Sequence, residues 1–415
     1  MELTTSPSAP KGPAAPLDDY QRRLVIFLSV ATFFEGYDFI ALSQILPTLR
    51  TEFHLSPRGG GAMVGFINAG TMLAALLVRR ADVWGRRRVL ALTITGYTLC
   101  SLATAFAPEV YSFSLLQLLA RVFLIGEWAI AMVYAAEEFP AERRGLVIGL
   151  IQGFSSLGSI ACAGVVPLLL KTSMGWRSVY VVGAIPLAMM AFARRNIRET
   201  SRFEHTRHED RAPLLALLGG PWRNRVLLVA LAWFFTYACT QSAVTFWKEF
   251  AVAERGFTDK AVGASITLAA VGSMPLVFAA GKLIDVLGRR RGAVVIFTLT
   301  AAGVVGAYSL HNPVALTVGL AGAIFGTSAV LPVLNAFTSE LFPTEARGDA
   351  FALANNLMGR ISYVLAPFAV GVIAQDSGWG FAVSVTAIGP LLALAVILAA
   401  LPETRGRELE ETSKL

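Results

Sequence analysis

Five ionisable side chains lie deep within long apolar stretches of this 415-residue chain: Glu35, Asp38, Arg121, Glu127 and Arg360. At the centre of a membrane helix, an ionised side chain costs about 2.5–3.5 kcal/mol on insertion scales. Residues that carry such a cost mark ion pathways, proton relays or binding sites. We therefore expect these five to pair with one another or to face a common site.

Two of the acids and one arginine have the arrangement that proton coupling requires. Glu35 and Asp38 are three residues apart, so they share one face of a helix. Arg121 is predicted to lie at a similar depth in another helix. In a medium of low dielectric, an acid beside an arginine can alternate between a salt bridge and a protonated, released form. We predict that Asp38 titrates with Arg121 as its partner, and that Glu35 and Glu127 are further proton-coupling candidates.

Arg360 follows Asn355-Asn356-Leu-Met-Gly359, and no acid of the same half lies at its depth. A guanidinium without a partner favours an anionic ligand, because its planar fork matches a carboxylate. The alternative is that Arg360 pairs with Glu127 or Glu35 across the molecule as a central gate. Polar or amphipathic residues elsewhere in the apolar stretches are further candidates for substrate binding: Tyr37, Gln241, Trp247, Asn335 and Asn356.

The composition indicates what must position these residues. Hydrophobic residues make up 55% of the chain and charged residues 15%, against about 25% charged in soluble proteins. The chain is therefore predicted to be an all-α integral membrane protein. Its net charge of +7 sits in short clusters between apolar runs, which excludes a nucleic-acid-binding face. The three cysteines lie in apolar runs. No metal or cofactor motif is present in the sequence, so neither a metal ion nor a cofactor is expected.

Stretches without Asp, Glu, Lys or Arg predict the spans, since about 20 residues cross a bilayer core. Residues 292–339 carry no charge and are too long for one helix, and His311-Asn312-Pro313 divides them. Three interrupted stretches bring the total to twelve helices. The charge-free runs are 59–78, 89–108, 145–170, 178–193, 226–247, 261–281, 292–339 and 377–402, and the interrupted ones are 24–49, 112–136 and 348–374.

Basic residues predict the orientation of these helices. One side collects 26 of the 35 Lys and Arg, the other side 7 and the membrane interior 2, which places both termini in the cytoplasm. The predicted organisation is a disordered tail (1–20), a six-helix bundle (21–196), a central cytoplasmic loop (197–223), a second six-helix bundle (224–401) and a cytoplasmic tail (402–415).

Two motifs recur at a constant shift of 203 residues. Asp82–Arg88 matches Asp285–Arg291, and Glu137–Gly145 matches Glu340–Gly348, which predicts a duplicated six-helix unit. The charges of these motifs are expected to form a latch that holds one gate state: Asp82, Arg86, Glu137, Asp285, Arg289 and Glu340. The spacing of Gly145, Gly149 and Gly153 predicts close packing against a neighbouring helix.

Several of these segments resemble known transporters. Gly281–Arg290 resembles the G-x-L-x-D-R-x-G-R-R signature of the major facilitator superfamily, and Pro402–Gly406 resembles the tail of its sugar-porter and organic-ion-transporter branch. Glu35–Asp38 is similar to the acidic D-G-x-D pattern of aromatic-acid:proton symporters, and Gly126–Trp128 to the G-E-W of metabolite:proton symporters. The spacing of Arg360 and Pro367 resembles that in organic-anion transporters.

The resemblance implies a secondary transporter of the cell inner membrane that works by alternating access, without enzymatic activity. Together with the buried charges, it leads us to expect proton-coupled symport of a small organic anion by a functional monomer. The alternatives are a proton-coupled sugar or sugar-acid symporter, and a drug or organic-cation:proton antiporter.

Overall fold

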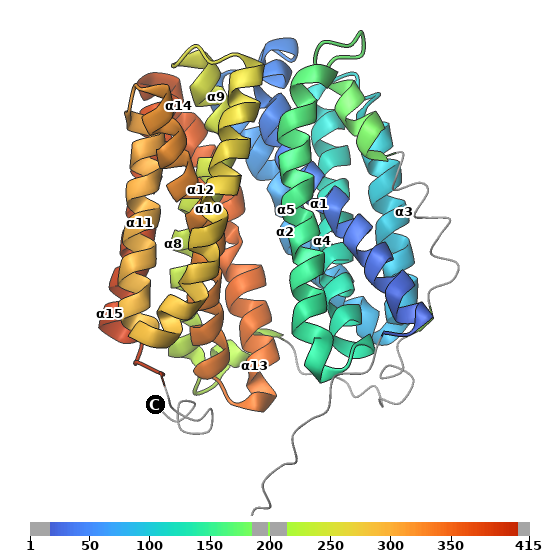
Figure 1. The fold of residues 1–415 in the computed structure, drawn as a ribbon, viewed down its shortest axis with the longest axis vertical. Helices are drawn as coiled ribbons and strands as arrows, with labels where there is room; N and C mark the ends of the chain where they lie inside the picture. Colours follow the sequence, from blue (N-terminus) through green and yellow to red (C-terminus); the bar gives the residue numbers. More distant parts are fainter. Residues whose placement is uncertain (1–16, 185–197, 200–213, 406–415) are drawn as a thin grey trace, which may run out of the picture.

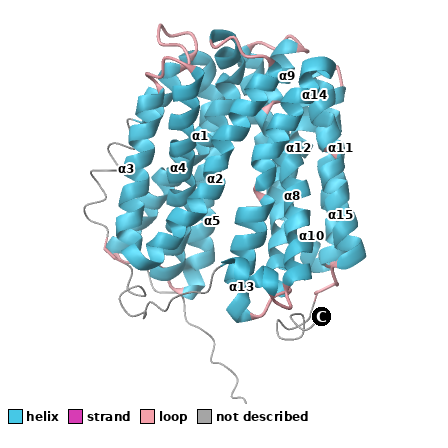
Figure 2. Cartoon of the chain, turned by 180° about the vertical axis from the view of Figure 1, so that it is seen from behind, coloured by secondary structure: helices cyan, strands magenta, loops and turns pink. Residues whose placement is uncertain are grey.

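The computed structural model describes residues 17–184, 198–199 and 214–405. Within those ranges the protein is built from helices and the loops that join them, and no strand occurs (Figure 2). The predicted all-α architecture is therefore confirmed for the described part of the chain.

The first half folds into five long helices, followed by a short helical stretch at residues 177–184. α1 packs along α5, and α4 packs against both α2 and α3. These helices form the blue-to-green side of Figure 1. They are α1 (Asp19–Glu52), α2 (Pro57–Trp84), α3 (Arg86–Thr104), α4 (Val110–Glu138) and α5 (Ala141–Leu169).

The second half forms the yellow-to-red side of Figure 1. α12 packs against α10 and α11, and α8 packs against α14 and α15. Its elements are the 3-10 helix η2 (Leu214–Gly219), α8 (Arg223–Thr245), α9 (Trp247–Ala253), α10 (Asp259–Leu287), α11 (Arg289–Ser309), α12 (Pro313–Glu340), α13 (Thr344–Phe351), the π-helix η3 (Ala352–Gly359), α14 (Ile361–Thr386) and α15 (Ile388–Ala400).

Local sequence sets several helix ends. The predicted break near Asn312 is confirmed, because its side chain accepts hydrogen bonds from the backbone N–H groups of Val314 and Ala315 and caps α12. Gly85 and Gly288 join α2 to α3 and α10 to α11 with φ of 94° and 90°. Glycine adopts this region readily. The matched glycines are 203 residues apart, so the repeat seen in the sequence is also a repeat of backbone conformation.

Nine of the described helical stretches are long and apolar enough to span a membrane. One of them, Ala346–Ala400, contains two passes, because the helical path breaks at Gly378, where φ is 79°. α3 begins with three arginines and is not among the nine, and the sixth predicted span lies mostly outside the described residues. The structure thus agrees with about twelve helices. The predicted domain boundaries stay a prediction.

Many large apolar side chains point away from the protein. Phe278 is 80% exposed, Leu146 74% and Phe106 69%. A soluble protein rarely exposes so many large apolar groups, whereas a lipid-facing helix surface consists of them. The surface therefore agrees with a protein embedded in a bilayer.

The two halves are packed together near α9, at the top of Figure 1, which we call the α9 end; the opposite end is the α13 end. Glycines allow the approach. A Cβ on Gly61 would lie 2.3 Å from the Pro367 carbonyl oxygen, and one on Gly263 would lie 2.4 Å from the Ala163 carbonyl oxygen. α2 and α14, and likewise α5 and α10, therefore touch through their backbones.

The predicted packing of Gly145, Gly149 and Gly153 is wrong for this conformation. A Cβ on any of the three would have no neighbouring atom within 4 Å. They lie in the first half of α5, towards the α13 end, while α5 meets α10 near Ala163 at the other end. Small residues permit a close contact, but the relative position of the two halves decides whether it forms.

Candidate functional site

The first acid of the predicted relay is held by close packing of α1 and α5. A Cβ on Gly36 would lie 1.9 Å from the Ser155 carbonyl oxygen, and one on Gly158 would lie 1.8 Å from the Phe33 carbonyl oxygen. This approach brings the Ser155 hydroxyl to the Glu35 carboxylate, to which it donates a hydrogen bond of 2.7 Å. Two glycines thus fix the position of an ionisable group.

Asp38 and Arg121 are both buried, each with 4% exposure. The Tyr97 side chain and the Arg121 guanidinium both lie close enough to the Asp38 carboxylate to interact with it electrostatically. Gly70 lets α2 lie against α4 at this level, since a Cβ there would be 3.0 Å from the Arg121 Cβ. The predicted partners are therefore brought into one buried group, although they form no direct ion pair among the described residues.

Glu127 is as buried as Asp38 but has no cationic neighbour that acts on it among the described residues. Its Oε1 atom is buried without a hydrogen-bond partner, and the charge that acts on it is the like charge of Glu35. A carboxylate in such surroundings is expensive, because neither a cation nor a donor compensates for its desolvation. The role of Glu127 in proton coupling stays a prediction.

Arg360 follows the π-helix η3 directly. The backbone N–H of Arg360 donates to the Asn355 carbonyl oxygen five residues back, at 3.2 Å. Such wide turns occur frequently at functional sites. The turn is fixed from α8, since the Tyr237 hydroxyl donates to Asn355 Oδ1 at 2.9 Å. The Arg360 guanidinium lies 6.0 Å from the centre of the Tyr363 ring, and its Nε atom is buried without a partner among the described residues.

These groups from the two halves lie near one another. Glu35 and Arg360 are close enough to interact electrostatically, as are Arg121 and Tyr363. Asn68 of α2 also bridges the halves, because its side-chain amide donates to the Tyr363 carbonyl oxygen at 3.2 Å. The central site thus contains two arginines and two acids, with no ion pair among these four side chains.

The other candidate binding residues have different surroundings. Tyr37 is buried and donates to the Val179 carbonyl oxygen, and Trp247 is buried at the α9 end, where its indole N–H donates to Ser265. Gln241 donates to Thr245 and is half-buried, Asn356 is half-buried in η3, and Asn335 is exposed on α12. In this conformation the hydroxyl of Tyr37 and the indole N–H of Trp247 are engaged within the protein. The role of all five in binding stays a prediction.

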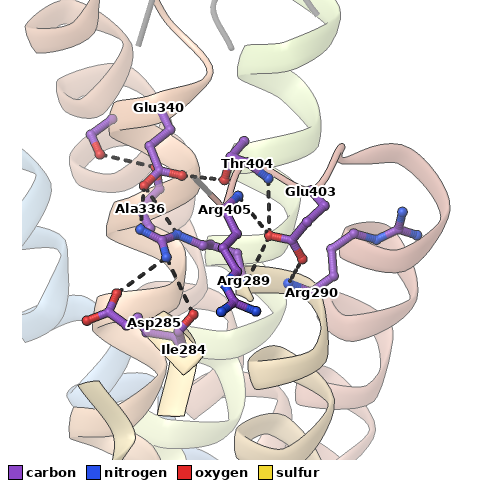
Figure 3. Close-up of polar contacts among 10 residues, drawn as sticks. Ile284, Asp285, Arg289, Arg290, Ala336, Glu340, Glu403, Thr404 and Arg405 are labelled. Carbon is purple, nitrogen blue, oxygen red and sulfur yellow. Dashed lines mark hydrogen bonds and ion pairs between the residues drawn. The ribbon is translucent and has the colours of Figure 1, made fainter. Parts of the chain in front are cut away.

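The predicted latch residues form charged contacts within each half. Arg86 pairs with Glu137 at 3.2 Å, and Arg289 pairs with Glu340 at 3.0 Å, which are equivalent pairs in the repeat. Arg289 also contacts Asp285 at 3.3 Å (Figure 3). The side chain of Asp82 lies outside the described part of the structure. The gating role of the six residues stays a prediction.

A carboxylate that sequence reasoning did not assign completes the second latch. Glu403 accepts hydrogen bonds from the backbone N–H groups of Arg289 and Arg290, both at 2.9 Å, and so caps α11 from a distant part of the chain (Figure 3). Burial would raise the pKa of Glu403, but the backbone donors outweigh it and hold that pKa below its usual value. Glu199 caps α3 similarly through Arg87 N–H, at 3.2 Å. The signal was the recurring Glu-Thr pair after the sixth and twelfth helices.

Metal chemistry finds no support in this part of the molecule. Among the described residues, no group of three or more His, Cys, Asp or Glu side chains could hold a metal ion.

Comparison with known proteins gives one consistent result. A sequence model of the Major Facilitator Superfamily matches residues 28–258 and 248–414. The gallate transporter of Pseudomonas putida is 26% identical over 429 residues, which cover 94% of each chain. The niacin transporter NiaP of Acinetobacter baylyi is 23% identical and covers 95% of this chain and 97% of its own. The structure of a D-xylose-proton symporter shares the fold, with a TM-score of 0.78 at 18% identity over 94% of this chain and 100% of that one.

Proposed function

This chain belongs to the Major Facilitator Superfamily, and from that premise we propose that it carries a small organic anion, a carboxylate, together with protons. It is a multi-pass membrane transporter and not an enzyme, as are its relatives. The substrate class and the coupling ion are the proposal. The alternative substrates, a sugar or an organic cation, have no comparable support at the centre of the molecule.

The observation that carries the proposal is the pair of central arginines. Arg121 and Arg360 come from different halves, and neither forms an ion pair with an acid among the described residues. A carboxylate ligand would supply a negative charge between the two halves, and the fork of Arg360 would bind it through two parallel hydrogen bonds. The names of the relatives agree, because gallate and niacin are both ring carboxylic acids. A transported cation would instead meet two positive charges.

Proton coupling is supported by the acids beside these arginines. Asp38 interacts with Arg121, and Glu35 interacts with both Arg121 and Arg360. When a substrate carboxylate occupies an arginine, it competes with the protein acids for that charge. The released acid then takes up a proton in its buried surroundings. Binding of the anion and of the proton would favour each other in this way, as symport requires.

The conformation agrees with one stage of alternating access. The halves are packed at the α9 end, and basic residues predict that the α13 end faces the cytoplasm. The protein would therefore offer its central site to the cytoplasm in this state. Rocking of the two halves about the central site would close the α13 end and separate them at α9.

Proton movement in proteoliposomes tests the proposal. A pH-sensitive dye enclosed in the vesicles would report proton influx when nicotinate, gallate, nicotinamide, xylose or an organic cation is added outside. We expect influx with the carboxylates and none with nicotinamide, which has the ring of nicotinate without its charge. Proton efflux upon addition of a cation would instead identify an antiporter and contradict the assignment of the arginines.

A further inference from the structure

Within the described part of the chain, one direct ion pair connects the two halves at the α9 end. Arg50, at the end of α1, contacts Glu249 of α9 through Nη1 and Oε2, at 2.6 Å. The Glu249 side chain is 3% exposed and that of Arg50 17%. Because the partners belong to different halves, the pair must break whenever the halves separate at this end.

Arg50 is held in position by its own half. A Cβ on Gly60 of α2 would lie 2.7 Å from the Arg50 Cδ atom, so this glycine provides the space in which the side chain lies. From the other half, the Trp379 ring covers the guanidinium at 5.2 Å. Gly60 moves together with Arg50, so the guanidinium keeps its support when Glu249 and Trp379 move away.

The ion pair uses only part of the hydrogen-bonding capacity of the two side chains. Arg50 Nε and Glu249 Oε1 are each buried without a hydrogen-bond partner among the described residues. An arginine and a carboxylate can form two parallel hydrogen bonds, which is the stronger arrangement. Burial also raises the pKa of Glu249, although Arg50 and Lys248 act in the opposite direction. Glu249 is thus a weak occupant of a site that a free carboxylate could fill better.

We propose that Arg50 is a second carboxylate-binding site, which Glu249 occupies while the α9 end is closed and the transported anion occupies when it opens. The inference rests on the proposed function for the class of ligand. The anion arriving from that side would replace Glu249 on Arg50, and the closed contact would lose its charge pair. Arg50 would therefore make opening of the α9 end responsive to the substrate.

A second ion pair at the same end provides a matched control. Glu52, two residues after Arg50, pairs with Arg177 at 2.8 Å and accepts a hydrogen bond from the Trp176 indole N–H at 2.6 Å. All three residues belong to the first half. Removal of the Glu52 charge therefore breaks a comparable ion pair without affecting how the two halves are joined.

Accessibility of a cysteine at Ser43 reports the opening. Ser43 is 5% exposed and lies two turns before Arg50 on the same face of α1. The test uses the purified full chain in detergent, with Cys100, Cys162 and Cys239 replaced by alanine, and measures the rate at which a charged methanethiosulfonate modifies Ser43→Cys. We expect Glu249→Gln to raise this rate on the order of tenfold. Glu52→Gln should leave the rate unchanged. Equal rates in the two variants would show that the Arg50–Glu249 pair does not hold the α9 end closed.

Ligand exchange is tested in the same reporter with Arg360→Ala added, so that the central site does not contribute. Millimolar nicotinate should still raise the rate of modification, nicotinamide should not, and Arg50→Gln should abolish the response to nicotinate. Equal responses to nicotinate and nicotinamide, or none to either, would overturn carboxylate binding at Arg50. Failure of the proposed function would be recognised separately in the proteoliposome assay, as proton efflux on addition of a cation or no proton influx with any carboxylate.

Discussion

The two halves of the molecule are near copies at the α13 end and differ at the centre. At the α13 end, Gly85 and Gly288 make the same turn, and Arg86–Glu137 corresponds to Arg289–Glu340. At the centre, the first half contributes acids around Arg121, whereas the second contributes Arg360 beside the Tyr363 ring, which packs against Tyr237. The two halves therefore share the turns and charged contacts at the α13 end, whereas the residues at the centre differ between them.

The largest effect should come from the acids of the first half, and from Asp38 in particular. Replacement of Asp38 by Asn removes a titrating group but keeps the size of the side chain. A carrier without coupling only equilibrates its substrate, so the accumulation ratio should fall to about 1 while exchange persists. Uptake driven by an imposed pH gradient and counterflow without a gradient measure the two quantities. Asp376→Asn, at an exposed position, is the control, and undiminished accumulation in Asp38→Asn would contradict the assignment.

Replacement of Arg360, in the second half, should weaken substrate binding instead of abolishing proton coupling. Arg360→Ala removes charge-assisted hydrogen bonds worth about 1.5–3 kcal/mol, which corresponds to a loss of affinity of roughly 10- to 150-fold for a carboxylate. Arg360→Lys keeps the charge without the fork and should be intermediate. Ligand titration of the purified protein measures both. Arg291→Ala, which replaces an exposed arginine in the first turn of α11, should bind normally. Equal affinity in Arg360→Ala and the parent protein would exclude Arg360 from the site.

Glycines of α5 sharpen the difference between packed and unpacked regions. Gly158→Ala would place a methyl group 1.8 Å from the Phe33 carbonyl oxygen and force α1 away from α5. Such overpacking costs about 1–3 kcal/mol and should also move Ser155 away from Glu35. Gly149→Ala meets no atom within 4 Å and should not lower stability. Thermal unfolding in detergent compares them, and equal melting temperatures would show that the α1–α5 contact tolerates a methyl group.

The smallest effect concerns the two remote helix caps. Glu403 accepts from the backbone N–H groups of Arg289 and Arg290, and Glu199 accepts from that of Arg87. Loss of a cap costs about 1 kcal/mol, so Glu403→Gln and Glu199→Gln should each lower the melting temperature by roughly 1–3 °C. Unchanged melting temperatures in both variants would contradict the capping assignment.

The pH dependence provides a second readout for Glu403. Its pKa is depressed in the fold, so the carboxylate stabilises the protein above its unfolded pKa, and that contribution is lost as the pH falls through the folded value. The parent protein should therefore lose more thermal stability in mild acid than Glu403→Gln does. Parallel losses in the two proteins would show that this carboxylate does not contribute to the acid sensitivity.

Periodicity and charge were sufficient for the parts of the fold that depend on local chemistry. The break at Asn312 could be predicted because an Asn-Pro pair caps a helix and cannot continue one. The buried positions of Asp38, Arg121 and Glu127 followed from the length of the apolar runs around them. The π-helix before Arg360 could not be predicted, because it depends on the hydrogen bond between Asn355 and Tyr237, which lies 118 residues away.

The sequence by itself determined that this is a duplicated, membrane-embedded helical transporter with five ionisable side chains inside its apolar stretches. Because a charge is costly to bury in lipid, apolar runs and the isolated charges within them can be recognised without knowledge of any tertiary contact. Only the tertiary structure decided which surfaces meet. It packed Gly36 against Ser155 and Gly158 against Phe33 while leaving Gly149 without a neighbour, and it paired Arg50 with Glu249 across the two halves. Such contacts depend on the relative position of the halves, which a transporter must change and which no local pattern of residues encodes.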